Sequence, residues 1–143
     1  MSFSTLSIRG LMWLLLFPVL ALAGCSSKKD DPAPLPGRWT LSTMHVVEKD
    51  ANGQLLQDYT LTGKSGDYLL LTDVLFQEYS NSQLNFEMPY TRAVNILTLK
   101  ALVEHLNQTR EIRELSASKL VLSYDRAAIV QGQSAKIEAT YTR

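Results

Sequence analysis

The sequence predicts a small all-β protein, an antiparallel barrel or sandwich of about eight strands. After residue 37, apolar and polar residues alternate through most of the chain, with the period of two that a half-buried strand requires. Turn residues separate these runs at close intervals, and the helical segments of about 10–15 residues that join parallel strands are missing. A chain of 143 residues, 45% of them apolar, supports one hydrophobic core.

The first 24 residues have the features of an export signal. A polar start with one cation, Arg9, precedes an apolar run over residues 11–23. This run is too short to cross a bilayer core of roughly 30 Å as a helix, but it suits the core of a secretory signal. A buried helix is the alternative, and Pro18 near its middle argues against it. We therefore predict that residues 1–24 are a signal peptide.

The apolar run ends in Leu22-Ala23-Gly24-Cys25, which contains the only cysteine of the sequence. This stretch resembles the lipobox of bacterial lipoproteins, in which cleavage precedes the cysteine. The resemblance implies that Cys25 carries acyl chains such as palmitate, and two or more chains attach a protein stably to a membrane. The alternative is an unmodified cysteine that follows an ordinary cleavage site. A disulfide within the chain is excluded, because the sequence has no second cysteine.

Residues 25–36 form the predicted tether between the anchor and the domain. Three prolines between residues 32 and 36 favour an extended chain, at about 3.1 Å per residue. Ser26, in place of the Asp that retains lipoproteins at the inner membrane of enteric bacteria, implies an outer-membrane location in the cell envelope. Lys29-Asp30-Asp31 resembles the surface-export signal of Bacteroidota lipoproteins, and a solvated tether is the alternative.

The predicted domain, residues 37–143, begins with two hairpins. A strand over residues 37–48 and a strand over residues 55–61 flank Asp50-Ala51-Asn52-Gly53, a sequence typical of a tight turn. Residues 68–79 predict one long strand that is apolar on both faces. Asn81-Ser82 then turns the chain into a clearly alternating strand, whose far end Pro89 is expected to limit.

The second half of the domain predicts further strands and contains one ambiguous stretch. Residues 93–100 alternate, but residues 101–115 also fit a helix on which Arg110 and Glu114 would pair. We favour a turn near residues 107–108 followed by a short strand over residues 110–115. Strands over residues 119–126 and 135–141 complete the count.

Gly37-Arg38-Trp39 resembles the Gly-x-Trp motif of the lipocalin-like superfamily. Residues 112–122 and the closing Tyr141-Thr142-Arg143 are similar to the short lipocalin-like domains of Bacteroidota lipoproteins. The resemblance covers residues 37–143 and implies a lipocalin-like barrel. It also implies that Trp39 packs across one end of the barrel beneath a late arginine, Arg126 or Arg143. The Thr-Asp-Tyr motif of longer lipocalins is absent.

The sequence offers no catalytic or metal-binding motif, so we expect a protein that is not an enzyme and holds no cofactor or metal. His45 and His105 lie far apart; His45 shares a predicted face with Trp39, inside the barrel or at its rim, and His105 is expected to be exposed. Glu78 and Glu87 would meet across a turn, as glycoside hydrolysis requires. The alternative for both glutamates is a solvated outer face.

Charge argues against a nucleic-acid partner. Removal of residues 1–24 takes away Arg9 and leaves 13 basic side chains against 14 acidic ones. Nucleic-acid binding depends on clustered cations that face phosphates, and this chain lacks such clusters.

The candidate site residues are aromatic. An eight-stranded barrel either fills with side chains or holds one small ligand, so these residues form the core or line a pocket. They are Trp39, Tyr59, Phe76, Phe86, Tyr90, Tyr124 and Tyr141. The leading hypothesis is a monomeric, lipid-anchored lipocalin-like protein that binds a small apolar ligand or an envelope partner. The alternative is an interaction or inhibitor module with a packed core, which makes its contacts through loops 62–67 and 127–134.

Overall fold

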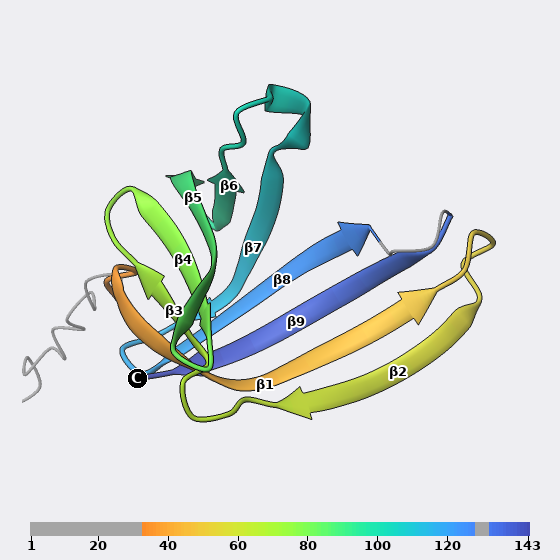
Figure 1. The fold of residues 1–143 in the computed structure, drawn as a ribbon, viewed down its shortest axis with the longest axis horizontal. Helices are drawn as coiled ribbons and strands as arrows, with labels where there is room; N and C mark the ends of the chain where they lie inside the picture. Colours follow the sequence, from red (N-terminus) through yellow and green to blue (C-terminus); the bar gives the residue numbers. More distant parts are fainter. Residues whose placement is uncertain (1–32, 128–131) are drawn as a thin grey trace, which may run out of the picture. The chain divides into compact units, whose positions relative to one another are not determined.

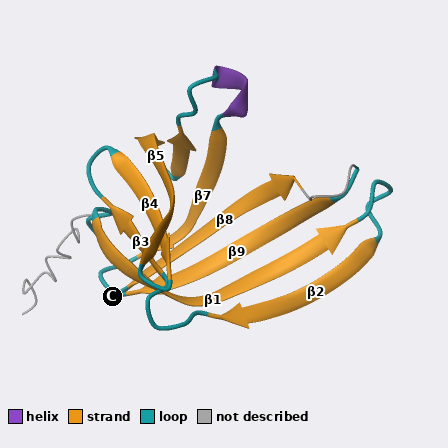
Figure 2. Cartoon of the chain, in the orientation of Figure 1, coloured by secondary structure: helices purple, strands orange, loops and turns teal. Residues whose placement is uncertain are grey.

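Nine antiparallel strands form one sheet that closes on itself (Figures 1 and 2). The structure is a computed structural model that describes residues 33–127 and 132–143, so the signal and most of the tether lie outside the described residues. The strands are β1 (Gly37–Lys49), β2 (Leu55–Thr62), β3 (Tyr68–Leu71), β4 (Leu75–Ser80), β5 (Gln83–Ala93), β6 (Ile96–Leu99), β7 (Gln108–Leu115), β8 (Lys119–Ala127) and β9 (Ser134–Thr142). A 3₁₀ turn over Glu104–Leu106 contains His105, which is exposed as predicted.

Strand β1 closes the barrel because both of its edges are paired. One edge pairs with β9 from Thr40 to Lys49, and the other pairs with β3 through Gly37–Thr40. Beyond that point the second edge pairs with β2 instead, from Thr43 onward. The closed barrel therefore has eight strands, with β2 as a ninth strand beside it, and the predicted all-β antiparallel barrel is confirmed. Figure 1 shows β1, β2, β8 and β9 running side by side, crossed by β3, β4 and β5.

A β-bulge at Ser42 reverses the two faces of β1. Ser42 is an extra residue in the pairing with β9, so the alternation before it does not continue after it. In an uninterrupted strand, residues with odd and even numbers point to opposite faces. Trp39 and Val46 are nevertheless both buried, because the bulge lies between them. His45 consequently faces outward, where its Nε2 lies 2.7 Å from Asp58 Oδ1. The prediction that His45 shares a face with Trp39 is wrong, because a period of two carries over only while the register holds.

The long strand predicted over residues 68–79 is in fact two strands, β3 and β4. Between them the chain reverses at Thr72, whose Oγ1 accepts the backbone N–H of Leu75 at 2.9 Å. Such a hydroxyl-capped turn needs no Gly or Pro, so neither residue marks it in the sequence. The turn places Leu71 opposite Phe76, and both side chains are buried.

Two other predicted boundaries also change. Strand β5 continues past Pro89 to Ala93, because Pro89 lies opposite Leu75, the first residue of β4, where a missing N–H is tolerated. The strand preferred over a helix after residue 107 is present as β7, and it begins at Gln108. The helical pair of Arg110 with Glu114 does not form, and Glu114 instead pairs with Lys119 Nζ at 2.7 Å.

The core is densest where the tether meets the barrel. Trp39 is fully buried, and its indole N–H donates to the carbonyl of Leu35 at 2.9 Å. Leu35 is itself 3% exposed, although the sequence places it in the tether. The compact unit runs from Pro32 to Arg143 and contains the whole described core, so the chain from Ser26 onward carries what the barrel needs to fold.

Of the two late arginines, Arg143 covers Trp39. The Arg143 guanidinium carbon lies 3.9 Å from the centroid of the indole ring, whereas Arg126 is exposed at the far end of β8. Arg143 also donates to three carbonyl groups, those of Pro34 at 2.9 Å, Pro36 at 3.2 Å and Ala117 at 2.8 Å. This one side chain therefore ties the start of the domain to the β7–β8 turn.

Candidate functional site

The seven aromatic candidates do not form one site. Four of them lie in the main core, namely Trp39, Phe76, Tyr90 and Tyr141. Phe86 and Tyr124 are partly buried against the same cluster, and Tyr59 packs against a second, smaller cluster around Val46, Ala135 and Ile137. The barrel is therefore filled at the Trp39 end, and open space has to be sought elsewhere.

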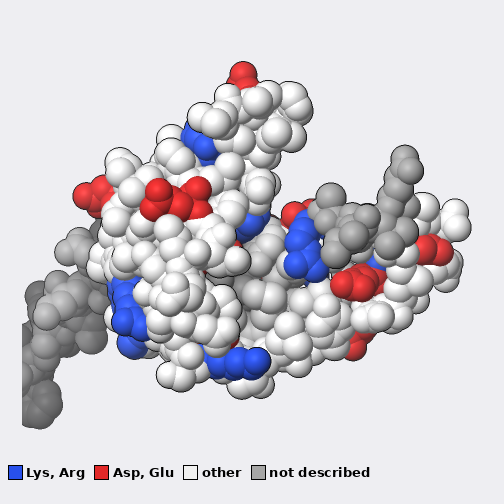
Figure 3. Space-filling model, in the orientation of Figure 1, with Lys and Arg blue, Asp and Glu red and all other residues white. Residues whose placement is uncertain are grey.

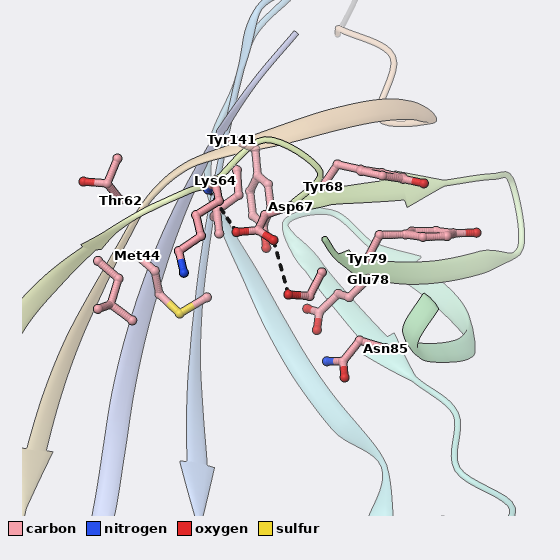
Figure 4. A pocket seen from close by; sticks show the side chains of 12 residues that line it. Met44, Thr62, Lys64, Asp67, Tyr68, Glu78, Tyr79, Asn85 and Tyr141 are labelled. Atoms are coloured by element: carbon pink, nitrogen blue, oxygen red, sulfur yellow. Dashed lines mark hydrogen bonds between the residues drawn. The ribbon is translucent and has the colours of Figure 1, made fainter. Parts of the chain in front are cut away.

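A pocket of about 370 Å³ lies where β2 and β3 separate (Figure 4). Strand β1 exchanges one partner for the other at this point, so the sheet is not continuous there. The apolar part of the wall comes from Leu41, Met44, Leu61 and Tyr141. The polar part comes from the β2–β3 loop, β4 and β5, with Lys64, Asp67, Glu78 and Asn85. Figure 4 shows Glu78 and Asn85 on one side of the pocket, with Met44 and Lys64 on the other.

The loop that borders the pocket is fixed to β1 by its backbone. Gly63 donates its N–H to Ser42 O at 2.8 Å, and the Leu41 N–H donates to Asp67 O at 3.0 Å. A Cβ at Gly63 would lie 2.0 Å from the Leu41 carbonyl oxygen, so only glycine allows this approach. The Asp67 carboxylate accepts the backbone N–H groups of Lys64 and Asn81, which lower its pKa. The pocket therefore has a preformed rim.

Glu78 is the acidic group that faces the interior. Its Cα partners are Leu69 and Phe86, both with inward side chains, whereas Glu87 pairs with Gln77 on the outer face. The expectation that Glu78 and Glu87 meet as a carboxylate pair is wrong, because adjacent residues of β4 point to opposite faces. Burial raises the pKa of Glu78, and the positive charge of Arg110 opposes that rise by a smaller amount.

Arg110 is a buried cation that sequence analysis did not identify as interior. It is 6% exposed, and its guanidinium carbon lies 3.9 Å from the Tyr124 ring centroid. Its terminal nitrogens donate to Thr109 O at 3.2 Å and Gln108 Oε1 at 2.9 Å, while Nε has no partner among the described residues. The sequence contained one sign of this position: Arg110 lies two residues before the apolar Ile112, so both share one face of the strand.

Four titratable side chains thus face one another inside the barrel, and they come from four strands. Glu78 stands on β4, Arg110 on β7, Tyr124 on β8 and Tyr141 on β9. Burial raises the pKa of both tyrosines, that of Tyr141 far above its usual range, and the negative charge of Glu78 adds to each shift. Both phenols are therefore neutral at physiological pH and can donate or accept a hydrogen bond.

Glu78 is expected to make the stability of the protein depend on pH. Its pKa is higher in the folded state than the ordinary 4.5, so the folded state holds this proton more tightly. The stability that results is fully present below the unfolded pKa and is lost as the pH rises through the folded pKa. Glu78→Gln removes this titration, so the variant should gain stability relative to the wild type as the pH rises from about 4 to about 8.

Urea unfolding at several pH values measures this difference. Glu87→Gln is the matched control, because it makes the same change at an exposed position on the outer face of the neighbouring strand. A constant difference between the Glu78→Gln variant and the wild type across the range would contradict a raised pKa of the half-buried Glu78.

In residues 33–127 and 132–143, no three His, Cys, Asp or Glu side chains are grouped to hold a metal ion. No helix in that part of the chain is long and apolar enough to cross a membrane. On the face drawn in Figure 3, acidic and basic groups are interspersed and separated by wide uncharged areas. Cys25 and part of loop 127–134 lie outside the described residues.

No family model matches the chain, and no curated protein and no solved structure is significantly similar to it.

Proposed function

We propose that this protein is a lipid-anchored protein of the cell envelope that binds a small, largely apolar molecule in the pocket between β1, β2 and β4. The observation that supports this function is the pocket of about 370 Å³, which has an apolar wall and a few convergent polar groups. Small-molecule sites are typically concave, apolar and about 300–1,000 Å³ in volume. The closed barrel provides a rigid scaffold for such a site.

Two side chains of the wall favour an apolar ligand. Leu61 on β2 is 51% exposed, and burying its surface contributes about 25 cal/mol for each Å² removed from water. Met44 faces Leu61 across the β1–β2 ladder, and its flexible thioether adapts to ligands of different shape. An apolar molecule placed here would cover a surface that the domain itself leaves open.

The binding experiment uses the chain from Ser26 to Arg143 and the uncharged fluorophore N-phenyl-1-naphthylamine, whose emission rises in apolar surroundings. We expect saturable binding of about one probe per chain. Leu61→Trp should fill the pocket and weaken binding roughly tenfold or more, the effect of about 1.4 kcal/mol. Leu56→Trp is the matched control, because Leu56 is an exposed leucine of the same strand and lies outside the pocket wall.

Equal binding by both tryptophan variants, or no saturable binding by the wild type, would contradict the pocket as the site. It would favour the alternative of an interaction module that uses its loops.

The membrane anchor is the second part of the proposal, and the resemblance of residues 22–25 to a lipobox supports it. The same resemblance, with Ser26 after the cysteine, supports an outer-membrane location.

Cys25→Ala should abolish acylation and release the protein from the membrane fraction, because the acyl chains supply about 0.8 kcal/mol per buried CH₂. Mass spectrometry and fractionation of the full chain measure both effects. Ser26→Ala is the control and should remain acylated; an acylated Cys25→Ala variant, or an unacylated wild type, would refute the anchor.

A further inference from the structure

We propose that the ligand of this pocket is an amphipathic amine, whose protonated head pairs with the Glu78 carboxylate while its apolar body lies against Leu41, Met44 and Leu61. This inference rests on the proposed function of the pocket and specifies its ligand class. It follows from the position of one carboxyl group and from the charges around it.

Glu78 reaches the pocket wall without a partner of its own. Among the described residues, no donor hydrogen-bonds its carboxyl group, and no cation lies within the 4.0 Å of an ion pair. Glu78 is half-buried, so its carboxylate loses part of its hydration, and an opposite charge brought next to it offsets that loss. A protonated amine supplies both the charge and the hydrogen-bond donors.

Arg110 does not take this role. Both of its terminal nitrogens already donate, to Thr109 O and Gln108 Oε1, and its guanidinium plane lies against the Tyr124 ring. It is not part of the pocket wall, so a ligand in the pocket meets Glu78 and not Arg110. The effect of burial on Glu78 exceeds the opposing effect of Arg110, which leaves the carboxylate under-compensated.

Among the charged side chains of the pocket wall, Glu78 is the one without a neighbouring opposite charge in that wall. Tyr124 and Tyr141 are neutral phenols, and Asn85 has an uncharged amide. Lys64 and Asp67 have opposite signs and interact with each other, and Lys64 is exposed to water. The wall therefore carries one net negative charge, which attracts a cationic head and disfavours an anionic one.

The arrangement of the wall also fits the two ends of such a ligand. Figure 4 shows Glu78 and Asn85 on the side of β4 and β5, with Met44 on the opposite side. Leu61 and Met44 are paired on β2 and β1, so the apolar surface is continuous there. An amine head at Glu78 leaves the apolar body facing this surface.

The test compares three octyl compounds that differ only in the head group: n-octylamine, 1-octanol and octanoate. Each displaces N-phenyl-1-naphthylamine from the chain Ser26–Arg143 near neutral pH. We expect octylamine to bind roughly tenfold to hundredfold more tightly than octanol, the range of a charge-assisted hydrogen bond, and octanoate to bind most weakly. Glu78→Gln should bring octylamine to the level of octanol, whereas the outer-face control Glu87→Gln should keep the preference for the amine.

The pH dependence provides a second readout. Octylamine binding should weaken as the pH falls and Glu78 takes up a proton, and octanol binding should change little. Burial raises the pKa of Glu78, and the charge of Arg110 opposes that rise. The other titratable groups around Glu78 are Tyr124 and Tyr141 inside the barrel, with Lys64 and Asp67 at the pocket rim.

The outcomes separate the ligand class from the pocket function. If the uncharged probe binds and Leu61→Trp blocks it, but octylamine shows no preference or keeps its preference in Glu78→Gln, the amine inference is overturned and the pocket function stands. If neither the probe nor any octyl compound binds, the pocket function itself fails, and the inference fails with it.

Discussion

Trp39→Ala is expected to lower the free energy of unfolding by about 3–5 kcal/mol, the cost of removing a large aromatic side chain from a packed core. The indole is fully buried among core residues, donates to Leu35 O and is covered by the Arg143 guanidinium. Its truncation would leave a cavity and would free the end of the barrel where three segments of chain meet. Such a loss is a large share of the roughly 5–15 kcal/mol by which small proteins are stable.

Urea unfolding of the chain Ser26–Arg143, followed by far-UV circular dichroism, measures the effect. Trp39→Phe is an informative control, because it keeps an aromatic ring beneath Arg143 and loses the indole N–H. It should cost less than Trp39→Ala. Arg126→Ala, at the exposed end of β8, should stay within about 0.5 kcal/mol of the wild type. A Trp39→Ala variant as stable as Arg126→Ala would show that Trp39 does not close the barrel.

The second large effect is expected from the four residues that precede β1. A chain that begins at Gly37 should be less stable than a chain that begins at Ala33 by about 2–5 kcal/mol, the range for loss of a buried leucine. The shorter chain lacks the buried Leu35 side chain and the carbonyl that accepts the Trp39 indole N–H. It also lacks the Pro34 and Pro36 carbonyls that accept hydrogen bonds from Arg143.

Thermal or urea unfolding of the two truncated chains, beside the chain from Ser26, gives the comparison. The chain from Ala33 should match the chain from Ser26, and Leu35→Ala in the longer chain should reproduce most of the loss. Identical unfolding midpoints for the Gly37 and Ala33 chains would place the start of the domain at Gly37, as the sequence suggested.

Local signals in the sequence predicted much of the fold because they act between near neighbours. The alternation after residue 119 gave β8 and β9 with the correct faces, and Asn81-Ser82 gave a turn in which both residues adopt positive φ, as tight hairpin turns require. Residues 50–53 form the predicted turn, with Gly53 at a φ of 81°. In each case the deciding chemistry lies within a few residues.

The interior polar groups required the tertiary structure. The sequence places Glu78 either in a pair with Glu87 or on an outer face, and it places Arg110 at the start of a strand without indicating a face. Only the pairing of their strands turns both side chains inward. Nothing within ten residues of Glu78 shows that the wall opposite it will carry Tyr141 of β9, because β9 follows more than fifty residues later. The pocket is likewise a product of topology, since it lies where β1 exchanges β3 for β2.

The sequence by itself therefore determined an all-β domain, the turns at residues 50–53 and 81–82, and the lipobox-like segment that predicts an anchor. The tertiary structure decided which face of β1 is inside, where the domain begins and which charges are buried. The physical reason is the period of two in a strand: one inserted residue, such as Ser42, exchanges the inner and outer faces for the rest of that strand. The alternation within a strand predicts that it has one apolar and one polar face. The pairing with distant strands decides which side chains point into the barrel.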